Sequence, residues 1–224
     1  MVGGQEISIV IRTRNEEDYI GFSIQSILDH FGKNTHIIVV DNESTDETLN
    51  NVALFPRKFY NIDIVHLPRK KYTPGKSLNI GIERAKSNIV GILSAHCSIQ
   101  KIDTKKLNDY FDEEKCFGVM GKQIPIFKGK KITPRYIWKN FQVSEAVKNP
   151  LELSDDNRYF FHNAFSFVNK SIWQNTPFDE DLTGKEDRFW AAKLIERGFN
   201  FYIEPSFVCH HFWTKNGATW VGIA

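Results

Sequence analysis

The sequence has few cysteines and no long apolar run, and these absences exclude several classes of protein. Three cysteines occur in 224 residues, Cys97, Cys116 and Cys209, and their spacing fits neither a disulfide framework nor a zinc ribbon. No run of about 18 apolar residues is present, and no basic segment followed by an apolar one opens the chain. We therefore expect a cytoplasmic protein without a membrane span or secretory signal.

An excess of one charge is also missing. The 29 Lys and Arg residues against 27 Asp and Glu residues give a net charge of +2, which predicts no nucleic-acid partner. Two short basic segments, 70–71 and 128–131, fit solvated loops. Their alternative is contact with an anionic membrane surface or a lipid-diphosphate acceptor, which would place the protein peripherally at the inner face of a membrane. The oligomeric state stays open.

Four short apolar segments alternate with helical patterns over the first hundred residues. Ile20, Ile24 and Ile27 recur at helical spacing after the first segment, and Leu49 and Val52 do so after the second. This alternation is typical of an α/β fold in which a mainly parallel, Rossmann-like sheet is flanked by helices. The expected strands are residues 7–11, 36–40, 62–66 and 89–93, and a further helix is expected over 75–85.

The pattern is less regular beyond about residue 100, which indicates a second, smaller lobe. A composition with 41% hydrophobic residues suffices for one large core, so we expect a single domain over residues 1–224, with halves 1–100 and 101–224. The elements expected in the second half are strands over 117–126, 159–168 and 201–211 and a helix over 186–197.

Polar residues follow three of the predicted strands directly. Ligands of open parallel sheets bind outside the carboxyl ends of the strands, because loops and helix N-termini converge there. Each residue alone also fits helix capping or solvation, but their coincidence on one rim favours a binding site. Glycine-rich dinucleotide and phosphate-loop motifs are absent. The rim residues are Arg12, Thr13, Arg14, Asn15 and Glu16, then Asp41 and Ser44, then Ser94, Ala95 and His96.

Four motifs, in order, make the chain similar to family 2 glycosyltransferases over nearly its whole length. They are residues 8–16, 38–46, 74–81 and 184–187. The resemblance implies a GT-A fold and an inverting enzyme, with a nucleotide-binding half over 1–100 and an acceptor-side half over 101–224.

The resemblance also implies roles for individual residues on the donor side. Asp41 would hydrogen-bond the base, residues 13–16 would surround the nucleoside, and Lys76 and Asn79 would lie nearby. Asn163 falls in a segment similar to one near the donor sugar. A carboxylate can accept from the imide N–H of uracil or thymine, which cytosine lacks, so a UDP- or dTDP-sugar is the expected donor.

The sequence departs from the family at residues 94–96, where Ser-Ala-His replaces the metal-binding Asp-x-Asp. An imidazole of His96, with His210 or His211, could hold Mn²⁺ or Mg²⁺ against the donor diphosphate. The alternative is neutralisation without a metal, by Arg12, Lys76 or Lys122. Ser-Ala-His and the segment 121–125 resemble a rhamnosyltransferase-like subset, which gives dTDP-rhamnose as a donor.

The acidic pair Glu186 and Asp187 begins the helix expected near the end of the chain. Displacement at an anomeric carbon needs a base for the acceptor hydroxyl, and Asp187 is the candidate, with Glu186 beside it. The alternative is stabilisation of a helix N-terminus by carboxylates. The function predicted is sugar transfer to a glycan or lipid-linked acceptor. The competing hypotheses are a sugar nucleotidyltransferase and a non-catalytic nucleotide- or glycan-binding module.

Overall fold

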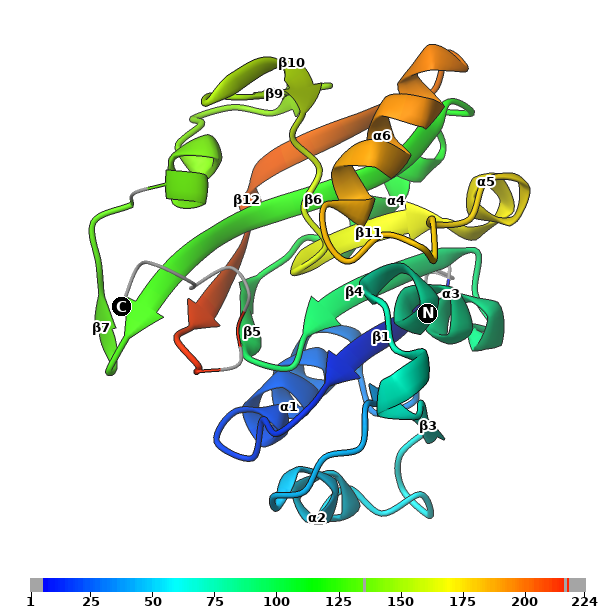
Figure 1. Cartoon of the computed structure of the whole chain (residues 1–224), viewed down its shortest axis with the longest axis vertical. Coiled ribbons are helices and arrows are strands. Elements are labelled where there is room, and N and C mark those ends of the chain that lie inside the picture. Colours follow the sequence, from blue (N-terminus) through cyan, green and yellow to red (C-terminus); the bar gives the residue numbers. More distant parts are fainter. Residues whose placement is uncertain (1–5, 135, 216, 218–224) are drawn as a thin grey trace.

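A ten-stranded mixed sheet runs through the whole molecule (Figure 1). The computed structural model describes residues 6–134, 136–215 and 217. The strands of the main path follow the order β3, β2, β1, β4, β11, β6, β12, β5, so strands from both halves of the chain share one sheet.

The first half of the sheet is parallel, as predicted. β1 (Ile7–Thr13) lies between β2 (His36–Asp41) and β4 (Ile89–Ser94), and β3 (Ile62–His66) pairs with β2 at the edge. All three pairings are parallel, so the carboxyl ends of these strands meet on one rim. The predicted polar clusters follow directly from these ends.

The second half of the sheet mixes strand directions. β11 (Phe165–Asn169) is antiparallel to both β4 and β6 (Cys116–Phe127) and joins the two halves. β12 (Asn200–Phe212) runs parallel to β6 and antiparallel to β5 (Cys97–Lys101). The α/β class with helices flanking a Rossmann-like sheet is confirmed, although the sheet is mainly parallel only in its first half.

One predicted strand is wrong in its middle part. Residues 159–168 divide between β10 (Asp155–Tyr159), which forms a separate hairpin with β9 (Leu151–Glu152), and β11. In the intervening loop, the backbone N–H of Asn163 bonds to Asp187 and that of Ala164 bonds to His162. The loop leaves the ladder because side chains satisfy its backbone donors.

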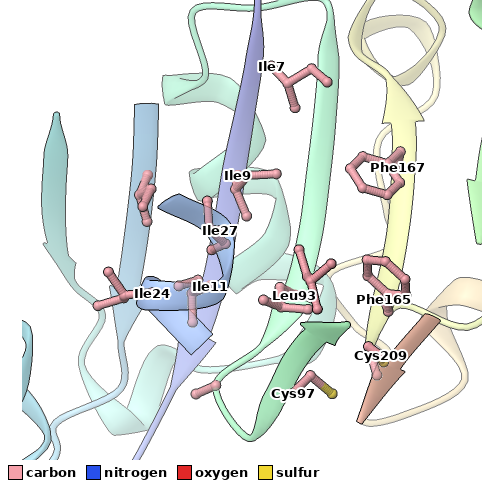
Figure 2. Close-up of a cluster of buried hydrophobic side chains, with 14 of the residues drawn as sticks. Ile7, Ile9, Ile11, Ile24, Ile27, Leu93, Cys97, Phe165, Phe167 and Cys209 are labelled. Carbon is pink, nitrogen blue, oxygen red and sulfur yellow. The ribbon is translucent and has the colours of Figure 1, made fainter. Parts of the chain in front are cut away.

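Side-chain alternation on β1 directs two hydrophobic clusters to opposite faces of the sheet. Ile9 and Ile11 lie beside Ile27 and Ile24 of the first helix, as Figure 2 shows, and Ile7 belongs to the same cluster. This face is covered by α1 (Ile20–Phe31), α2 (Thr48–Ala53) and α4 (Thr104–Phe111).

The opposite face carries the second cluster, which contains Val10 of β1 and Ile92 of β4. Trp190 is buried here. The helices on this face are α3 (Pro74–Arg84), α5 (Lys170–Asn175) and α6 (Glu186–Glu196).

Short elements complete the second half. They are the strands β7 (Lys130–Lys131) and β8 (Val147–Lys148) and the 3₁₀ helix η2 (Tyr136–Phe141); a further 3₁₀ helix, η1 (Arg69–Lys71), follows β3. Both basic segments are solvent-exposed. No helix within the described part of the chain is long and apolar enough to cross a bilayer.

Candidate active site

Asp41 lies buried at the carboxyl end of β2, with a carboxylate fixed by the following turn. The Ser44 hydroxyl donates to Asp41 Oδ1 at 2.5 Å, and the Ser44 backbone N–H donates to Oδ2 at 3.2 Å. Glu43 between them adopts a left-handed conformation with φ of 52°. The turn orients an acceptor group at the strand end, because each carboxylate oxygen keeps a further lone pair.

Hydrogen bonds join the loop after β1 to the loop after β2. Asn15, also left-handed with φ of 52°, accepts from the Thr45 N–H at 2.8 Å, and its own N–H donates to the Ser44 hydroxyl at 3.0 Å. The Glu16 N–H donates to the Thr48 hydroxyl at 2.8 Å. The structure therefore brings together the two polar clusters that the sequence places about thirty residues apart.

Buried polar atoms without a partner gather on this rim. They are Thr13 Oγ1, Arg14 Nε, Glu16 Oε2 and Asn163 Nδ2, and none has a hydrogen bond within the described part of the chain. Buried polar groups in folded proteins are nearly always bonded. These four atoms therefore indicate a site whose polar groups are completed by a ligand.

His96 faces this rim and is oriented by a carboxylate. Its Nδ1 lies 3.1 Å from Glu16 Oε1. A carboxylate in this contact accepts, so Nδ1 carries the proton and the lone pair is on Nε2, the arrangement found in metal-binding histidines. The ring of His211 lies 4.8 Å from that of His96, between centroids. Burial holds the pKa of His211 well below its ordinary value, with the neighbouring His96 adding to the effect.

The third predicted metal ligand lies elsewhere. His210 precedes His211 on β12 and points to the opposite face of the strand. Lys122 precedes Gln123 on β6 and likewise points away from the Gln123 side chain, which bonds to His211. The structure therefore does not bring the three histidines together, and Lys122 does not join the histidine cluster. Within the described residues no group of three or more metal-ligating side chains occurs.

Two other predicted donor contacts are structural. The side chain of Ala95 belongs to the first hydrophobic cluster, and its carbonyl accepts from Ser23. Asn79 accepts from Trp173 Nε1 and the Phe178 N–H and donates to the Phe178 carbonyl and Glu180. All four hydrogen-bonding positions of its amide are filled, so Asn79 fastens α3 to the segment before α6 and in this arrangement has no hydrogen bond left for a nucleotide.

Two predicted residues lie closer to the rim. Ser94 ends β4 beside Arg12 of β1 and is partly exposed. Lys76, in the first turn of α3, forms an ion pair with Glu180 at 3.1 Å, with about a third of its side chain exposed. Solvent screening makes such a pair weak, so Lys76 can exchange it for an anionic ligand.

The acidic pair opens α6 and is buried. The Asp187 carboxylate accepts from the Arg188 guanidinium at 2.8 and 2.9 Å, from the Arg188 backbone N–H at 2.9 Å and from the Asn163 N–H at 3.1 Å, so a reacting hydroxyl would have to replace one of these donors. Burial opposes ionisation, but the Arg188 charge outweighs it and lowers the pKa of Asp187. Burial raises the pKa of Glu186, and the charge of Asp187 adds to that rise. Neighbouring carboxyl groups with pKa values displaced in opposite directions are typical of acid–base sites.

Arg12 connects the two sides of the site. It extends from the end of β1, and its guanidinium lies 3.4 Å from Glu186 Oε1 and 3.4 Å from the Pro74 carbonyl. The acidic pair therefore lies next to the strand-end rim. Arg12 and Glu186 are 174 residues apart in the sequence, so no local sequence pattern reveals their contact.

A cavity of about 910 Å³ lies between η2, the β9–β10 hairpin and the start of α6. Its walls contain residues to which the sequence interpretation gave no role, although Lys185 falls within the motif 184–187 and His162 within the segment that includes Asn163. Those nearest the acidic pair are His162, Arg188, Lys185 and Glu152, and those at the apolar side are Tyr136, Ile137 and Leu153.

His162 is the most strongly perturbed of these groups. Burial, together with the Arg188 charge, lowers the pKa of His162 to about 3. Its Nδ1 accepts from Gln123 Nε2 at 2.9 Å and from the Ala164 N–H at 3.3 Å. It is therefore a neutral imidazole at the cavity wall.

Comparison with known proteins identifies the family. The model of glycosyl transferase family 2 matches residues 8–175. This chain belongs to that family. RfbN of Salmonella typhimurium, an O-antigen chain rhamnosyltransferase, is 24% identical over 215 residues, which cover 92% of this chain and 66% of RfbN. A Campylobacter jejuni protein named GalNAc(5)-diNAcBac-PP-undecaprenol beta-1,3-glucosyltransferase is 23% identical over 96% of this chain and 67% of its own length.

Solved structures share the fold. Staphylococcus aureus TarS, residues 1–349 in complex with UDP-GlcNAc, aligns with a TM-score of 0.72 at 20% identity, over 95% of this chain and 60% of TarS. GalNAc-T7 with UDP, GalNAc and Mn²⁺ aligns with a TM-score of 0.74 at 14% identity, over 97% of this chain and 45% of GalNAc-T7. The chain spans 59–66% of the length of the first relatives that it matches, a Haemophilus influenzae glycosyltransferase among them.

Proposed function

We propose that this chain is the catalytic part of an inverting glycosyltransferase that moves a sugar from a UDP- or dTDP-sugar to a hydroxyl group of a glycan or lipid-linked acceptor. The observation that carries the proposal is the 3.4 Å contact between Arg12 and Glu186, which sets a nucleotide-type rim beside a buried acidic pair. The names of the relatives agree with it, since RfbN is a rhamnosyltransferase and the C. jejuni protein is named for an undecaprenol-linked glycan. dTDP-rhamnose is therefore one donor to test.

The donor would bind at the rim with its base against Asp41. The carboxylate, held by Ser44, would accept from the imide N–H of uracil or thymine. The unpartnered atoms of Thr13, Arg14 and Glu16 would be completed by the nucleoside. Arg12 and Lys76 would face the diphosphate with positive charge.

Asp187 would act as the base. Its lowered pKa keeps it ionised at neutral pH, so it can take the proton of the acceptor hydroxyl. The hydroxyl oxygen then bonds to the anomeric carbon from the side opposite the nucleotide. The bond from this carbon to the diphosphate oxygen breaks, its electron pair leaves with the diphosphate, and the configuration inverts. Arg12 stabilises the charge that develops there.

A divalent cation fits beside His96. The Glu16 contact leaves the His96 lone pair on Nε2, and Glu16 Oε2 is buried without a described partner. His96, with His211 nearby, would hold Mn²⁺ or Mg²⁺, and donor oxygens and water would complete its ligands. Such an ion supplies positive charge to the leaving diphosphate.

A nucleotide screen tests the proposal. We expect UDP or dTDP to bind at least tenfold more tightly than GDP or CMP in calorimetry, since only uracil and thymine offer the imide donor within a pyrimidine. The matching diphosphate-sugar should be hydrolysed slowly and its sugar transferred with inversion. Equal binding of all four nucleotides, or formation of a nucleotide sugar from a sugar phosphate and a nucleoside triphosphate, would contradict the proposal.

The metal is tested with His96→Ala. Mn²⁺ should tighten binding of UDP or dTDP to the parent protein about tenfold or more, and the variant should lose that increment. His30→Ala, on α1 away from the rim, is the matched control and should keep it. An identical increment in His96→Ala, or none in the parent protein, would favour neutralisation by Arg12 and Lys76.

A further inference from the structure

The His162 ring is held in one orientation on the cavity wall. The residue is 6% exposed, and its ring contacts Phe141 edge-on and Phe160 at a tilt, with centroids 5.9 and 6.2 Å away. Its Nδ1 points inward to Gln123 and the Ala164 N–H. These contacts hold the plane of the ring, and the two hydrogen bonds to Nδ1 select one of its two flipped positions, so its edge toward the cavity is fixed.

The backbone N–H of Ala164 determines where the protons lie in the series of hydrogen bonds from His162 through Gln123 to His211. The Ala164 N–H can only donate, so His162 Nδ1 must accept and the ring proton lies on Nε2. The group of Gln123 that faces Nδ1 is then its NH₂, and its Oε1 faces His211, 2.9 Å from Nδ1. Gln123 is fully buried and cannot turn to solvent. The tautomer of His162 is therefore fixed by the fold, not by a ligand.

The fixed tautomer gives His162 one polar group for the cavity, a hydrogen-bond donor at Nε2. Asp187 provides the opposite chemistry next to it, because an ionised carboxylate only accepts. The two are adjacent: the backbone N–H of Asn163, the next residue after His162, bonds to Asp187 Oδ2 at 3.1 Å. A donor on the cavity wall and a buried acceptor thus lie close together.

We propose that His162 determines acceptor specificity by donating its Nε2–H to an acceptor oxygen next to the hydroxyl that reacts, and that Gln123 is the positioning residue that fixes this donor. This inference rests on the proposed function. The acceptor class that fits is a sugar with two neighbouring oxygens, one a hydroxyl that gives its proton to Asp187 and the other an oxygen that accepts from His162. An acceptor without the second oxygen leaves the buried donor unpaired, and such mismatches are costly.

The tautomer can be observed directly. Two-bond ¹H–¹⁵N correlation spectra of ¹⁵N-histidine-labelled protein should show His162 as a neutral ring with its proton on Nε2, assigned by loss of the signals in His162→Gln. Gln123→Met removes one of the two donors to Nδ1 and leaves the Ala164 N–H, so the proton should stay on Nε2 while the Nδ1 resonance in this pattern shifts and the ring loses part of its fixed orientation. A proton on Nδ1 in the parent protein, or a pattern unchanged by Gln123→Met, would overturn the proposal.

Acceptor selection is tested with methyl glycosides of rhamnose, glucose, galactose and N-acetylglucosamine and with their monodeoxy analogues. The donor is whichever UDP- or dTDP-sugar the parent protein hydrolyses. Removing one particular oxygen should raise the acceptor KM of the parent protein about three- to tenfold. His162→Phe should show that rise with the intact acceptor and no further rise with the deoxy analogue.

Conservative variants separate a donor from mere packing. A glutamine amide can reach the place of Nε2, whereas an asparagine amide reaches only that of Nδ1, so His162→Gln should stay sensitive to the missing oxygen and His162→Asn should not. His30→Gln is the control and should match the parent protein. Equal sensitivity of every variant to every deoxy analogue would overturn the proposal.

The two proposals fail in different ways. If the parent protein hydrolyses a nucleotide sugar but no glycoside alters the His162 ring signals, the specificity role is overturned and the proposed function stands. If the parent protein hydrolyses no nucleotide sugar, the proposed function fails and the specificity role fails with it.

Discussion

The two sides of the proposed site are assembled differently, the strand-end rim as its donor side and the acidic pair with the neighbouring cavity as its acceptor side. On the donor side, contacts join neighbouring loops, such as Asn15 with Thr45, about thirty residues apart in sequence. On the acceptor side, Gln123 bonds to His162 and to His211, 39 and 88 residues away. The donor rim is built by the regular order of parallel strands, whereas the acceptor side depends on how distant segments pack. The chemistry differs as well, because pKa values are displaced mainly on the acceptor side.

The largest expected effect is on the acceptor side. Asp187→Asn should lower kcat about 10²- to 10⁴-fold, because the amide cannot take the hydroxyl proton. Nucleotide binding should change little, since Asp187 lies beyond Arg12 from the base pocket. Transfer rates and calorimetry with the same donor measure both. Asp109→Asn, on exposed α4, is the control. Full transfer by a folded Asp187→Asn protein would exclude it as the base.

The pH profile distinguishes the two members of the acidic pair. The pKa of Asp187 is lowered, so a base at Asp187 stays ionised down to about pH 4, near the ordinary pKa of Asp, and kcat should show no acidic limb above it. The pKa of Glu186 is raised, so with Glu186 as the base the enzyme would lose activity at a higher pH than with Asp187 as the base. An acidic limb that disappears in Glu186→Gln would assign the base to Glu186.

The next effect belongs to the donor side. Asp41→Ala should weaken UDP or dTDP binding about 10- to 100-fold, the loss expected for a hydrogen bond to a charged group. Calorimetry measures it, and kcat at saturating donor should fall less than in Asp187→Asn. Asp63→Ala on the adjacent β3 is the matched control. If Asp41→Ala bound the nucleotide as tightly as the parent protein does, the uracil or thymine ring would bind somewhere other than at Asp41.

The packing of α3 against the segment before α6 can be strained directly by a substitution at Gly75. Gly75 in the first turn of α3 lies against the carbonyl of Asp179, and a Cβ there would overlap that oxygen. Gly75→Ala should therefore lower the free energy of unfolding by about 1–3 kcal/mol. Denaturant unfolding measures it. Gly21→Ala, where a Cβ has open space, is the control and should not destabilise. Equal stability of both variants would show that this contact adjusts freely.

The smallest effect is a pH-dependent one within the second half. Burial of Glu204 opposes its ionisation, but hydrogen bonds from Lys106, Ser206 and Tyr110 outweigh it and lower its pKa to about 2. Because the pKa of Glu204 is lower in the folded protein, its ionisation stabilises the fold fully at pH values above about 4.3, the ordinary pKa of Glu in an unfolded chain. This stability is lost as the pH falls toward about 2.

Glu204→Gln should therefore cost about 1–2 kcal/mol at neutral pH, because part of the ion pair is screened by solvent. The difference from the parent protein should shrink as the pH falls from about 4.3 toward 2. Urea unfolding between pH 7 and 2.5 measures it, and Glu114→Gln, on an exposed turn, is the control. A difference that does not depend on pH would exclude the charge as its cause.

Particular residues show how far the sequence leads. Asp41, Ser44, Asn15 and Glu16 meet as predicted, because strand ends and turn residues follow from a local pattern. Asn79 belongs to the motif 74–81 that suggested a donor contact, but its amide bonds to Trp173 and residues 178–180. A motif gives a position, whereas only the packed neighbours show whether its hydrogen bonds are available.

The histidines show the other limit. His210 and His211 are equivalent in sequence, and which of them faces His96 depends on the register of β12. That register shifts between Glu204 and Val208, and such a bulge exchanges the faces of all following residues. His162 was missed for a related reason, since its environment comes from Gln123 and Arg188, far away in sequence.

The sequence by itself determined the parallel half of the sheet, the family and the position of the donor rim, because hydrophobic periodicity and strand-end residues are local properties. Only the tertiary structure decided which histidine meets His96, that the amide of Asn79 bonds to Trp173 and residues 178–180, and that His162 lies on the cavity wall with Nδ1 bonded to Gln123. These depend on register, burial and hydrogen-bond partners, which long-range packing sets.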